Sequence, residues 1–324
     1  MEVRKMKKIL LVSSSSGGHI FPCITLGKFL VNKGYDVTFM GIRAKMEEEL
    51  FFGNSIYLTI PNSFKKSLKN IKSLVDNLKY KKDVKEFDIT IVFGGFISFY
   101  VTYFLHPKNL FIHEQNVVMG DSNLLCYPFC KKLFSSFPIE GKKILYASSP
   151  SADRFRSVKF KKKIENILFI FGSLGSSSLL KKTLEFTKIN KKYHVTIVKG
   201  KRVNDEVNDE HFIPFLDSEK DIYNFDLIFT RGGATTLIEI MKTRIPFVVV
   251  PSPYVKRNHQ EKNALFLKDY CYIIKEKDYD VNSISSAISF FENEEYRYSI
   301  YKKHLDKKEI NSCETILEEI KKYD

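Results

Sequence analysis

The sequence predicts an α/β protein with two Rossmann-like domains, whose parallel sheets face each other across a cleft. Short apolar runs alternate with amphipathic stretches along the chain, which is typical of βαβ units. A strand, a loop rich in glycine and serine, and a helix are expected at residues 7–31, and the pattern returns at 166–185. The chain of 324 residues is also too long for one typical core and fits two domains of about 150 residues each.

The first domain begins with a strand at residues 7–13. Apolar residues between Ile20 and Val31 then recur with the spacing of one helix face, and Lys33 and Gly34 end this helix. Further strands are expected at 36–41, 87–95 and 109–113, and in the second half from residue 166 onward and at 193–200, 211–215, 226–233 and 245–253.

A polar, basic segment at 148–165 predicts the linker between the domains. We therefore expect an N-terminal domain at 1–155 and a C-terminal domain at 156–305. A C-terminal helix at about 306–324 is expected to pack back on the first domain.

Composition excludes several classes of protein. With 44% hydrophobic and 28% charged residues the chain is globular, not disordered. No apolar run approaches the roughly 20 residues that span a bilayer, and the first apolar run is too short for a secretory signal, so a cytoplasmic location is expected. The five scattered cysteines predict reduced thiols, without a disulfide framework or a zinc site.

Positive charge is concentrated in the first half of the chain. Residues 1–160 have a balance of +11 and residues 161–324 a balance of +3, which together make the net charge of +14. This asymmetry favours an anionic partner for the first half, such as a phosphate group, a nucleic acid or a membrane surface. A lysine-rich composition that only aids solubility is the alternative.

The motif GGHIFP follows the first strand. Gly17 and Gly18 are expected to allow a tight turn and the close approach of a ligand, and Pro22 fits the first turn of a helix. His19 would then lie at a helix N-terminus, at the end of a parallel sheet where ligands bind. The helix dipole disfavours a second proton there, so His19 is expected to be neutral and able to accept a proton. The alternative is a histidine that only caps the turn.

Three further loops carry polar or glycine-rich motifs. After the strand at 109–113, Glu114 and Asn116 can hydrogen-bond a polyhydroxyl substrate, unless they only satisfy the loop backbone. The loop with Ser173 and Gly175 can present backbone N–H groups to a phosphate, although it matches neither a Walker loop nor a complete dinucleotide motif. The third region, at 230–264, supplies candidates for binding a diphosphate, a ribose and a sugar: Arg231, Gly233, Ala234, Thr235, Glu239, His259, Gln260 and Asn263.

Residues 63–85 predict a basic amphipathic helix, with eight lysines and two aspartates. Such a helix can lie on an anionic bilayer surface, or it can pack on its own domain with its lysines in water. The residues expected to contact a membrane are Leu68, Lys69, Ile71, Lys72, Val75, Leu78 and Lys79.

Taken together, GGHIFP, FGGF, HEQN, FGSLGS, RGGATTLIE and NHQEKNA resemble the motifs of the MurG family, in the family's order and over most of the chain. The resemblance implies a GT-B fold and an inverting transfer of GlcNAc from UDP-GlcNAc to the MurNAc C4 hydroxyl of lipid I. The product is lipid II, a precursor of the peptidoglycan on which cell shape and division depend. It also implies a peripheral enzyme on the cytoplasmic side of the membrane, with the acceptor bound by the first domain and UDP-GlcNAc by the second.

The same resemblance assigns roles to single residues. His19 matches the proposed base, and Glu114 and Asn116 match residues at the acceptor side or the cleft, where Glu114 is expected to be catalytic together with His19. Ser173 matches a donor contact and Glu239 the ribose-binding glutamate. Ala234 and Thr235 match residues near the diphosphate, and Gln260 a residue near the GlcNAc hydroxyls. One departure is Ala152, which stands where the family has an arginine that Arg154 or Arg156 would have to replace.

No cofactor and no metal are expected, because helix N-termini and backbone donors can stabilise the diphosphate. The single D-x-D string, Asp278-Tyr279-Asp280, is expected to cap a helix. The main alternative is a GT-B transferase that acts on another lipid, such as diacylglycerol. An epimerase that uses UDP-GlcNAc, a nucleic-acid-binding protein and an inactive sugar-binding relative are weaker alternatives.

Overall fold

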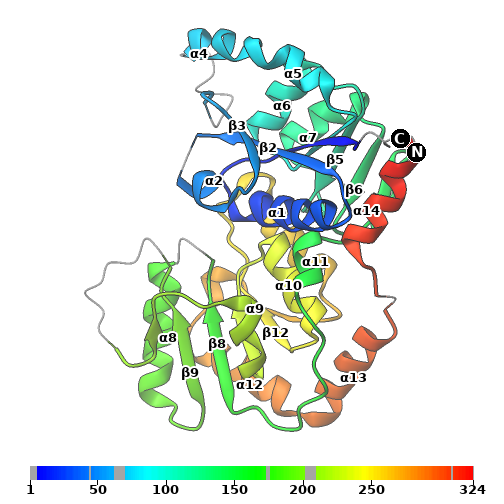
Figure 1. Ribbon diagram of the computed structural model, residues 1–324. Coiled ribbons are helices and arrows are strands. Elements are labelled where there is room, and N and C mark those ends of the chain that lie inside the picture. Colours follow the sequence, from blue (N-terminus) through cyan, green and yellow to red (C-terminus); the bar gives the residue numbers. More distant parts are fainter. Residues whose placement is uncertain are drawn as a thin grey trace. The chain divides into compact units, whose positions relative to one another are not determined.

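The computed structural model describes residues 6–43, 45–61, 70–172, 176–200, 209–307 and 309–323. The chain divides into two compact units. Unit 1 contains Met1–Arg154 together with Ile310–Asp324, and unit 2 contains Phe155–Glu309. In Figure 1, blue to green segments build unit 1, and the red C-terminal segment returns to it.

Unit 1 is built on a parallel sheet that has seven strands in the described residues, in the order β3-β2-β1-β4-β5-β6-β7. Alternate residues of a strand face opposite sides of a sheet. Accordingly, Ile9 and Leu11 of the central strand β1 belong to one core cluster, and Leu10 and Val12 belong to another. The strands are β1 (Lys8–Val12), β2 (Asp36–Ile42), β3 (Asn54–Leu58), β4 (Ile89–Val92), β5 (Leu110–Glu114), β6 (Lys132–Ser135) and β7 (Ile144–Tyr146).

Helices cover both faces of this sheet. Helices α1 and α14 pack on the Ile9 side, and α6 with the turn η3 packs on the Leu10 side. The helices are α1 (Gly17–Asn32), α2 (Lys45–Leu50), α4 (Ile71–Asp76), α5 (Lys81–Glu86), α6 (Phe96–Tyr100), α7 (Asp121–Cys126) and α14 (Ser312–Ile320). Shorter turns are η2 (Asn77–Tyr80), η3 (Val101–Leu105), η4 (Tyr127–Phe129), η5 (Pro150–Arg154) and η9 (Lys321–Tyr323).

The N-terminus of α1 differs from the expectation. The helix begins at Gly17, because the extended backbone of Ser16 already forms its N-cap. Gly17 and Gly18 are therefore helical residues and not a tight turn, and Pro22 lies inside the helix, not in its first turn. Further along α1, Gly27 allows close packing, since a Cβ there would lie 2.3 Å from the Phe39 ring of β2.

The C-terminal helix α14 is part of the core of unit 1. Cys313, Ile316 and Ile320 are buried against the same cluster as α1. The Asp153 carboxylate in η5 accepts hydrogen bonds from the backbone N–H groups of Ser312 at 3.0 Å and Cys313 at 2.8 Å. This carboxylate satisfies donors in the first turn of α14, where a negative charge is favourable.

Unit 2 has a parallel sheet with six strands in the described residues, in the order β10-β9-β8-β11-β12-β13. Its core contains residues of β8, β9, β11, β12, α8 and α12. The strands are β8 (Asn166–Ile170), β9 (His194–Val198), β10 (Phe212–Ile213), β11 (Leu227–Thr230), β12 (Phe247–Val249) and β13 (Tyr272–Ile273). The helices and turns are α8 (Ser177–Ile189), α9 (Ser218–Asp221), η6 (Ile222–Asn224), α10 (Ala234–Thr243), η7 (Lys256–Asn258), α11 (His259–Phe266), η8 (Glu276–Asp278), α12 (Val281–Glu292) and α13 (Glu294–Leu305).

The strands expected from the sequence are confirmed in both units, whereas β3, β6, β7 and β13 were not expected.

Asp280 caps α12, as expected, in a capping box with Ser283. The five cysteines are free and buried. Among the described residues, no helix combines the length and the apolar character needed to cross a membrane.

The helix expected at 63–85 is confirmed in part, since the described residues 71–86 are helical throughout but do not form one regular α-helix. The chain there forms α4, η2 and α5, three short pieces in succession. Asn77 lies where α4 passes into η2, and its buried side chain accepts a hydrogen bond from Thr59 N at 3.2 Å and donates one to Thr59 O at 3.1 Å. These bonds satisfy backbone groups next to β3 and attach this end of α4 to unit 1.

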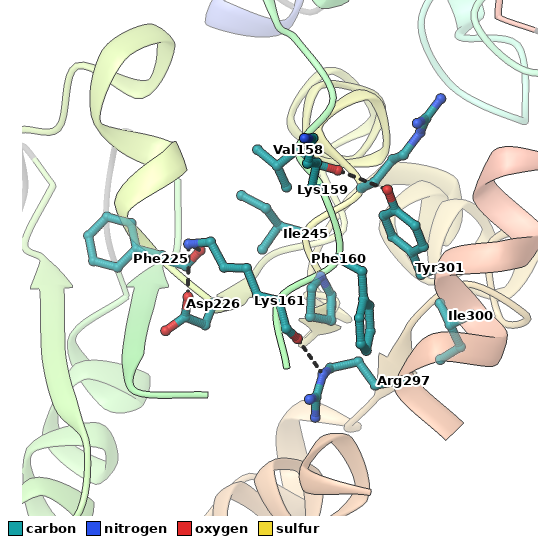
Figure 2. A pocket seen from close by; sticks show the side chains of 12 residues that line it. Val158, Lys159, Phe160, Lys161, Phe225, Asp226, Ile245, Arg297, Ile300 and Tyr301 are labelled. Atoms are coloured by element: carbon teal, nitrogen blue, oxygen red, sulfur yellow. Dashed lines mark hydrogen bonds and ion pairs between the residues drawn. The ribbon is translucent and has the colours of Figure 1, made fainter. Parts of the chain in front are cut away.

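The segment after Phe155 is attached firmly to unit 2 (Figure 2). Lys161 Nζ lies 2.8 Å from Asp226 Oδ1, and Tyr301 donates a hydrogen bond to Val158 O at 3.2 Å. Arg297 donates to the Lys161 carbonyl at 3.4 Å. The cavity that these residues surround has a volume of about 20 Å³, which is enough for a water molecule.

Candidate active site

His19 lies in the first turn of α1, directly after the loop that leaves β1. Its Nδ1 atom is 2.6 Å from the Ser14 hydroxyl oxygen and 2.8 Å from that of Ser16. The side chain is half-buried. The expected position at a helix N-terminus and at the carboxyl end of a parallel strand is therefore confirmed, while the role of His19 as a base stays a prediction.

The glycine turn after β4 packs against this histidine. Gly94 and Gly95 have φ values of 100° and 79°, which favour glycine. A Cβ on Gly94 would lie 3.0 Å from His19 Nε2, and one on Gly95 would lie 2.5 Å from the Ser14 hydroxyl oxygen. The Ser98 hydroxyl holds the turn, since it accepts a hydrogen bond from Gly94 N at 2.9 Å and donates one to Gly94 O at 2.8 Å.

The HEQN motif supports the same turn from β5. His113 Nε2 lies 3.3 Å from the Ser148 carbonyl oxygen, and because a carbonyl only accepts, Nε2 carries the proton. Gln115 Nε2 then donates to His113 Nδ1 at 3.2 Å and to Phe93 O at 3.0 Å. Burial lowers the pKa of His113 to about 4, so its imidazole is neutral near pH 7. His113 and Gln115 are thus a buried scaffold beneath the glycine turn.

Glu114 organises the loop that follows β5. Its side chain is only 1% exposed. Oε1 accepts hydrogen bonds from the backbone and the side-chain nitrogens of Asn116, at 2.9 and 3.2 Å. Oε2 accepts from Gly120 N at 2.9 Å and from Asn123 Nδ2 at 2.8 Å. The carboxylate therefore holds the shape of this loop, and its expected catalytic role stays a prediction.

In unit 2, helix α10 begins at Ala234, with Gly233 as its N-cap. The preceding Gly232 touches α11, and a Cβ there would lie 2.4 Å from the Gln260 carbonyl oxygen. The buried Asn263 side chain donates to Gly232 O at 3.0 Å. The loop is thereby fixed against α11, so that Ala234 and Thr235 form the first turn of α10, where the dipole favours an anion.

The side chain of Arg231 is held by hydrogen bonds to other loops of unit 2. Its two Nη atoms lie 2.7 and 3.2 Å from the Glu276 carboxylate oxygens. They also donate to Ser176 Oγ at 3.0 Å and to Val250 O at 3.2 Å. Arg231 therefore ties together the loops that follow β8, β11, β12 and β13.

The remaining candidates of unit 2 lie on α10 and α11. Glu239 is half-buried in the second turn of α10, about 7.5 Å along the axis from Ala234. His259 Nδ1 donates to the Lys256 carbonyl at 2.9 Å, and Gln260 Oε1 accepts from Ser252 N at 2.9 Å. Two of the expected donor contacts, Ser173 and Gly175, lie outside the described residues, as do Leu68 and Lys69 in unit 1.

Two sequence-family models match this chain. The glycosyltransferase family 28 N-terminal domain matches residues 9–135, and the glycosyltransferase family 28 C-terminal domain matches residues 166–315. The chain belongs to glycosyltransferase family 28.

Relatives place the chain more finely within family 28. A Campylobacter jejuni protein is 28% identical over 86% of this chain and 89% of its own length. A Sulfurihydrogenibium protein is 27% identical over 97% of this chain and 98% of its own length. Both are named UDP-N-acetylglucosamine–N-acetylmuramyl-(pentapeptide) pyrophosphoryl-undecaprenol N-acetylglucosamine transferase. The predicted membership of the MurG family and the predicted glycosyltransferase class are confirmed.

Solved structures confirm the GT-B fold class. Acinetobacter baumannii MurG matches with a TM-score of 0.78 and 22% identity, over 98% of this chain and 99% of that one. The glycosyltransferase of kitacinnamycin matches with a TM-score of 0.70 and 14% identity, over 98% and 99% of the two chains.

Sequence reasoning missed several residues of this family 28 site. Ser14, Ser16 and Ser98 hold His19 and the glycine turn, and Glu47 binds Ser15 Oγ at 2.6 Å. The run of serines before Gly17 is the sequence feature that could have indicated these contacts, but such a run is also typical of an ordinary flexible loop. Within the described residues, no group of three His, Cys, Asp or Glu side chains is arranged to hold a metal ion.

Proposed function

We propose that this chain transfers GlcNAc from UDP-GlcNAc to the C4 hydroxyl of MurNAc in lipid I (undecaprenyl-diphospho-MurNAc-peptide), giving lipid II for peptidoglycan synthesis. The observation that carries the proposal is that two relatives named for this transfer align with 86% and 97% of the chain. Unit 1 would bind the lipid-linked acceptor and unit 2 the nucleotide-sugar donor.

In the proposed mechanism His19 acts as the general base. Its imidazole takes the proton from the acceptor hydroxyl as the oxygen attacks the anomeric carbon of GlcNAc. The new C–O bond forms as the bond between the anomeric carbon and the diphosphate oxygen breaks, which inverts the configuration and releases UDP. The scaffold of His113 and Gln115 supports the glycine turn that lies against Nε2, and Glu114 shapes the adjacent loop.

Helix α10 supplies the proposed donor site. The first turn, with Gly233, Ala234 and Thr235, would bind the diphosphate through backbone N–H groups and the helix dipole. Glu239 would accept hydrogen bonds from the ribose hydroxyls. We expect that this charge stabilisation replaces a metal ion, so that transfer is unchanged by EDTA. Loss of activity in EDTA, restored by a divalent cation, would contradict this part of the proposal.

We further propose that unit 1 binds the cytoplasmic face of the cell membrane as a peripheral protein. Ile71, Val75 and Leu78 of α4 and η2 are 61%, 56% and 38% exposed, so each presents apolar surface to the solvent. Lys72 and Lys79 are exposed on the same segment. Exposed apolar residues with flanking lysines are suited to an anionic lipid surface.

The membrane proposal is tested by pelleting the full chain with vesicles. Wild type should bind vesicles that contain anionic lipid more than neutral ones, and the variant Ile71→Ser/Val75→Ser should lose most of this binding. The paired variant Ile189→Ser in α8 removes an apolar residue that is 73% exposed in unit 2, and it should bind like wild type. Equal binding to neutral and anionic vesicles would refute the proposal.

Transfer of labelled GlcNAc from UDP-GlcNAc to a lipid I analogue tests the proposed function directly. Wild type should form the lipid II analogue, and His19→Ala should lose about 100-fold or more in kcat while it still binds UDP-GlcNAc. A wild-type protein that binds UDP-GlcNAc but transfers only to diacylglycerol would move the assignment to another lipid acceptor.

A further inference from the structure

Four serines, Ser13 to Ser16, lie between β1 and α1, and the hydroxyl groups of the last three contact His19 or Glu47. Ser14 and Ser16 both place their hydroxyl oxygens on His19 Nδ1, at 2.6 and 2.8 Å. Ser15 turns the other way and donates to Glu47 Oε1 at 2.6 Å. The side chain of Glu47 is fully buried, so it holds the middle of the loop from the protein interior. The loop is therefore a built structure around one face of the imidazole.

Two hydroxyl oxygens beside one ring nitrogen favour one of the two neutral tautomers of His19. A bare Nδ1 has a single lone pair and can accept well from only one of the two hydroxyls. An Nδ1–H group can instead be shared between the two oxygens as a three-centre hydrogen bond. The arrangement therefore favours the proton on Nδ1 and the lone pair on Nε2. When Nε2 accepts a proton, the Nδ1–H bond is kept and the oxygens stabilise the imidazolium.

Packing restricts the Ser14 side chain. A Cβ on Gly95 would lie 2.5 Å from both Cβ and Oγ of Ser14, so the glycine turn closes over this side chain. On the other side of the ring, Nε2 faces Gly94, where a Cβ would lie 3.0 Å away, so a side chain at this position would crowd the nitrogen. The loop therefore holds one nitrogen of the ring, and the absence of a side chain at Gly94 keeps the other from being crowded.

We propose that Ser14 and Ser16 are positioning residues, which hold the His19 imidazole with its proton on Nδ1 and its lone pair on Nε2, ready to take the proton of the acceptor hydroxyl. This inference rests on the proposed function of His19 as a base. It assigns to two hydroxyl groups the orienting task that a carboxylate performs in many histidine-dependent enzymes. Ser15, bound to Glu47, keeps the two flanking serines facing the ring.

Nitrogen NMR of the histidine-labelled full-length protein tests the proposal without any substrate. The His19 signals, assigned with a His19→Gln variant, should show a protonated Nδ1 and an unprotonated Nε2 at a pH where the ring is neutral. In Ser14→Ala/Ser16→Ala the population should move towards the Nε2–H tautomer. A wild-type ring that already carries its proton on Nε2, or a tautomer that is the same in the double variant, would overturn the proposal.

Kinetics give a second readout that a purely structural role would not produce. Ser14→Ala and Ser16→Ala should each lower kcat, and the double variant should lower it by about 10-fold or more, with the KM for UDP-GlcNAc unchanged. Ser16→Thr keeps the hydroxyl at an exposed position and should restore wild-type kcat and tautomer. If Ser16→Thr behaves like Ser16→Ala, the hydroxyl is not what matters and the inference fails.

Failure of this inference can be told apart from failure of the proposed function. If wild type transfers no GlcNAc to the lipid I analogue, the proposed function fails, yet the tautomer of His19 still reports on Ser14 and Ser16. If wild type transfers GlcNAc and the serine variants keep wild-type kcat, the inference alone fails. If the double variant does not fold, the single variant Ser16→Ala still tests the inference, because Ser16 lies at an exposed position.

Discussion

Arg231 and Glu276 form a bidentate ion pair in unit 2, with contacts of 2.7 and 3.2 Å. The two side chains are only 13% and 15% exposed. Because Arg231 also donates to the loops after β8 and β12, this pair fixes the edge of the sheet at which α10 begins. We infer that Arg231 serves donor binding mainly by holding these loops.

The variant Glu276→Gln separates this structural role from direct donor contact. It leaves a largely buried guanidinium without its anion and should lower the free energy of unfolding by about 2–4 kcal/mol. The affinity for UDP-GlcNAc should also fall, because the loops that Arg231 connects are then held less firmly. Thermal denaturation and calorimetric titration measure both effects. If Arg231 instead binds the diphosphate directly, Glu276→Gln would leave donor affinity unchanged or raise it, whereas Arg231→Gln would abolish it.

Glu239 is predicted to distinguish donors by their ribose. The change Glu239→Ala should weaken UDP-GlcNAc binding by about 10- to 100-fold, the worth of hydrogen bonds to a charged group. An analogue of UDP-GlcNAc that lacks the 2′-hydroxyl should bind wild type more weakly and lose less on the same substitution. Equal losses for the two donors would mean that Glu239 does not contact this hydroxyl.

The parallel sheets and the position of His19 were predictable from the sequence because they depend on local patterns. Apolar runs such as that of β1 and the periodic face of α1 are readable within a few residues. The role of Asn263 was not predictable, since its side chain serves Gly232, which is 31 positions earlier in the chain. The same holds for Glu47, whose partner Ser15 is 32 positions away. Only the fold brings such partners together.

Short or interrupted elements also could not be predicted from the sequence pattern. Strand β7 has three residues and β13 has two, fewer than a periodic pattern needs. The lysine-rich segment reads as one helix because Ile71, Val75 and Leu78 share a helical spacing. The change to a 3-10 turn begins at Asn77, whose hydrogen bonds to Thr59 on a separate segment no local propensity records.

Two buried histidines predict a loss of stability in mild acid. Burial lowers the pKa of His113 in unit 1 and of His304 in unit 2 to about 4, below the unfolded value of 6.5. Between pH 6.5 and 4 the unfolded chain binds a proton at each site that the folded chain does not. The free energy of unfolding should therefore fall as the pH falls through this window, by about 3 kcal/mol for each histidine, with no further loss below it.

Denaturant titrations at several pH values check this slope. His113→Gln should reduce the dependence of stability on pH in unit 1 by about one proton, even though it costs stability near pH 7. His194→Gln, at an exposed position of β9, is the matched control and should leave the dependence as it is. An unchanged slope in His113→Gln would show that this imidazole does not resist protonation in the folded state.

The last prediction compares two neighbouring glycines at the start of α10. A methyl group at Gly232 would lie 2.4 Å from the backbone oxygen of Gln260, whereas one at Gly233 would meet no atom within 4 Å. Gly232→Ala should therefore destabilise the protein by about 1–3 kcal/mol, because α11 has to move. The φ of −67° and ψ of 122° at Gly233 suit alanine, so Gly233→Ala should change stability by no more than about 0.5 kcal/mol.

The affinity for UDP-GlcNAc is compared in the same two variants. Both substitutions should weaken it, Gly232→Ala by displacing the loop and Gly233→Ala by placing a methyl group where the diphosphate is expected. Thermal denaturation and calorimetric titration of the two variants, side by side with wild type, separate the cases. A Gly233→Ala protein that keeps both its stability and its full affinity for UDP-GlcNAc would place the diphosphate away from the N-terminus of α10, and with it the proposed stabilisation of the leaving group by this helix.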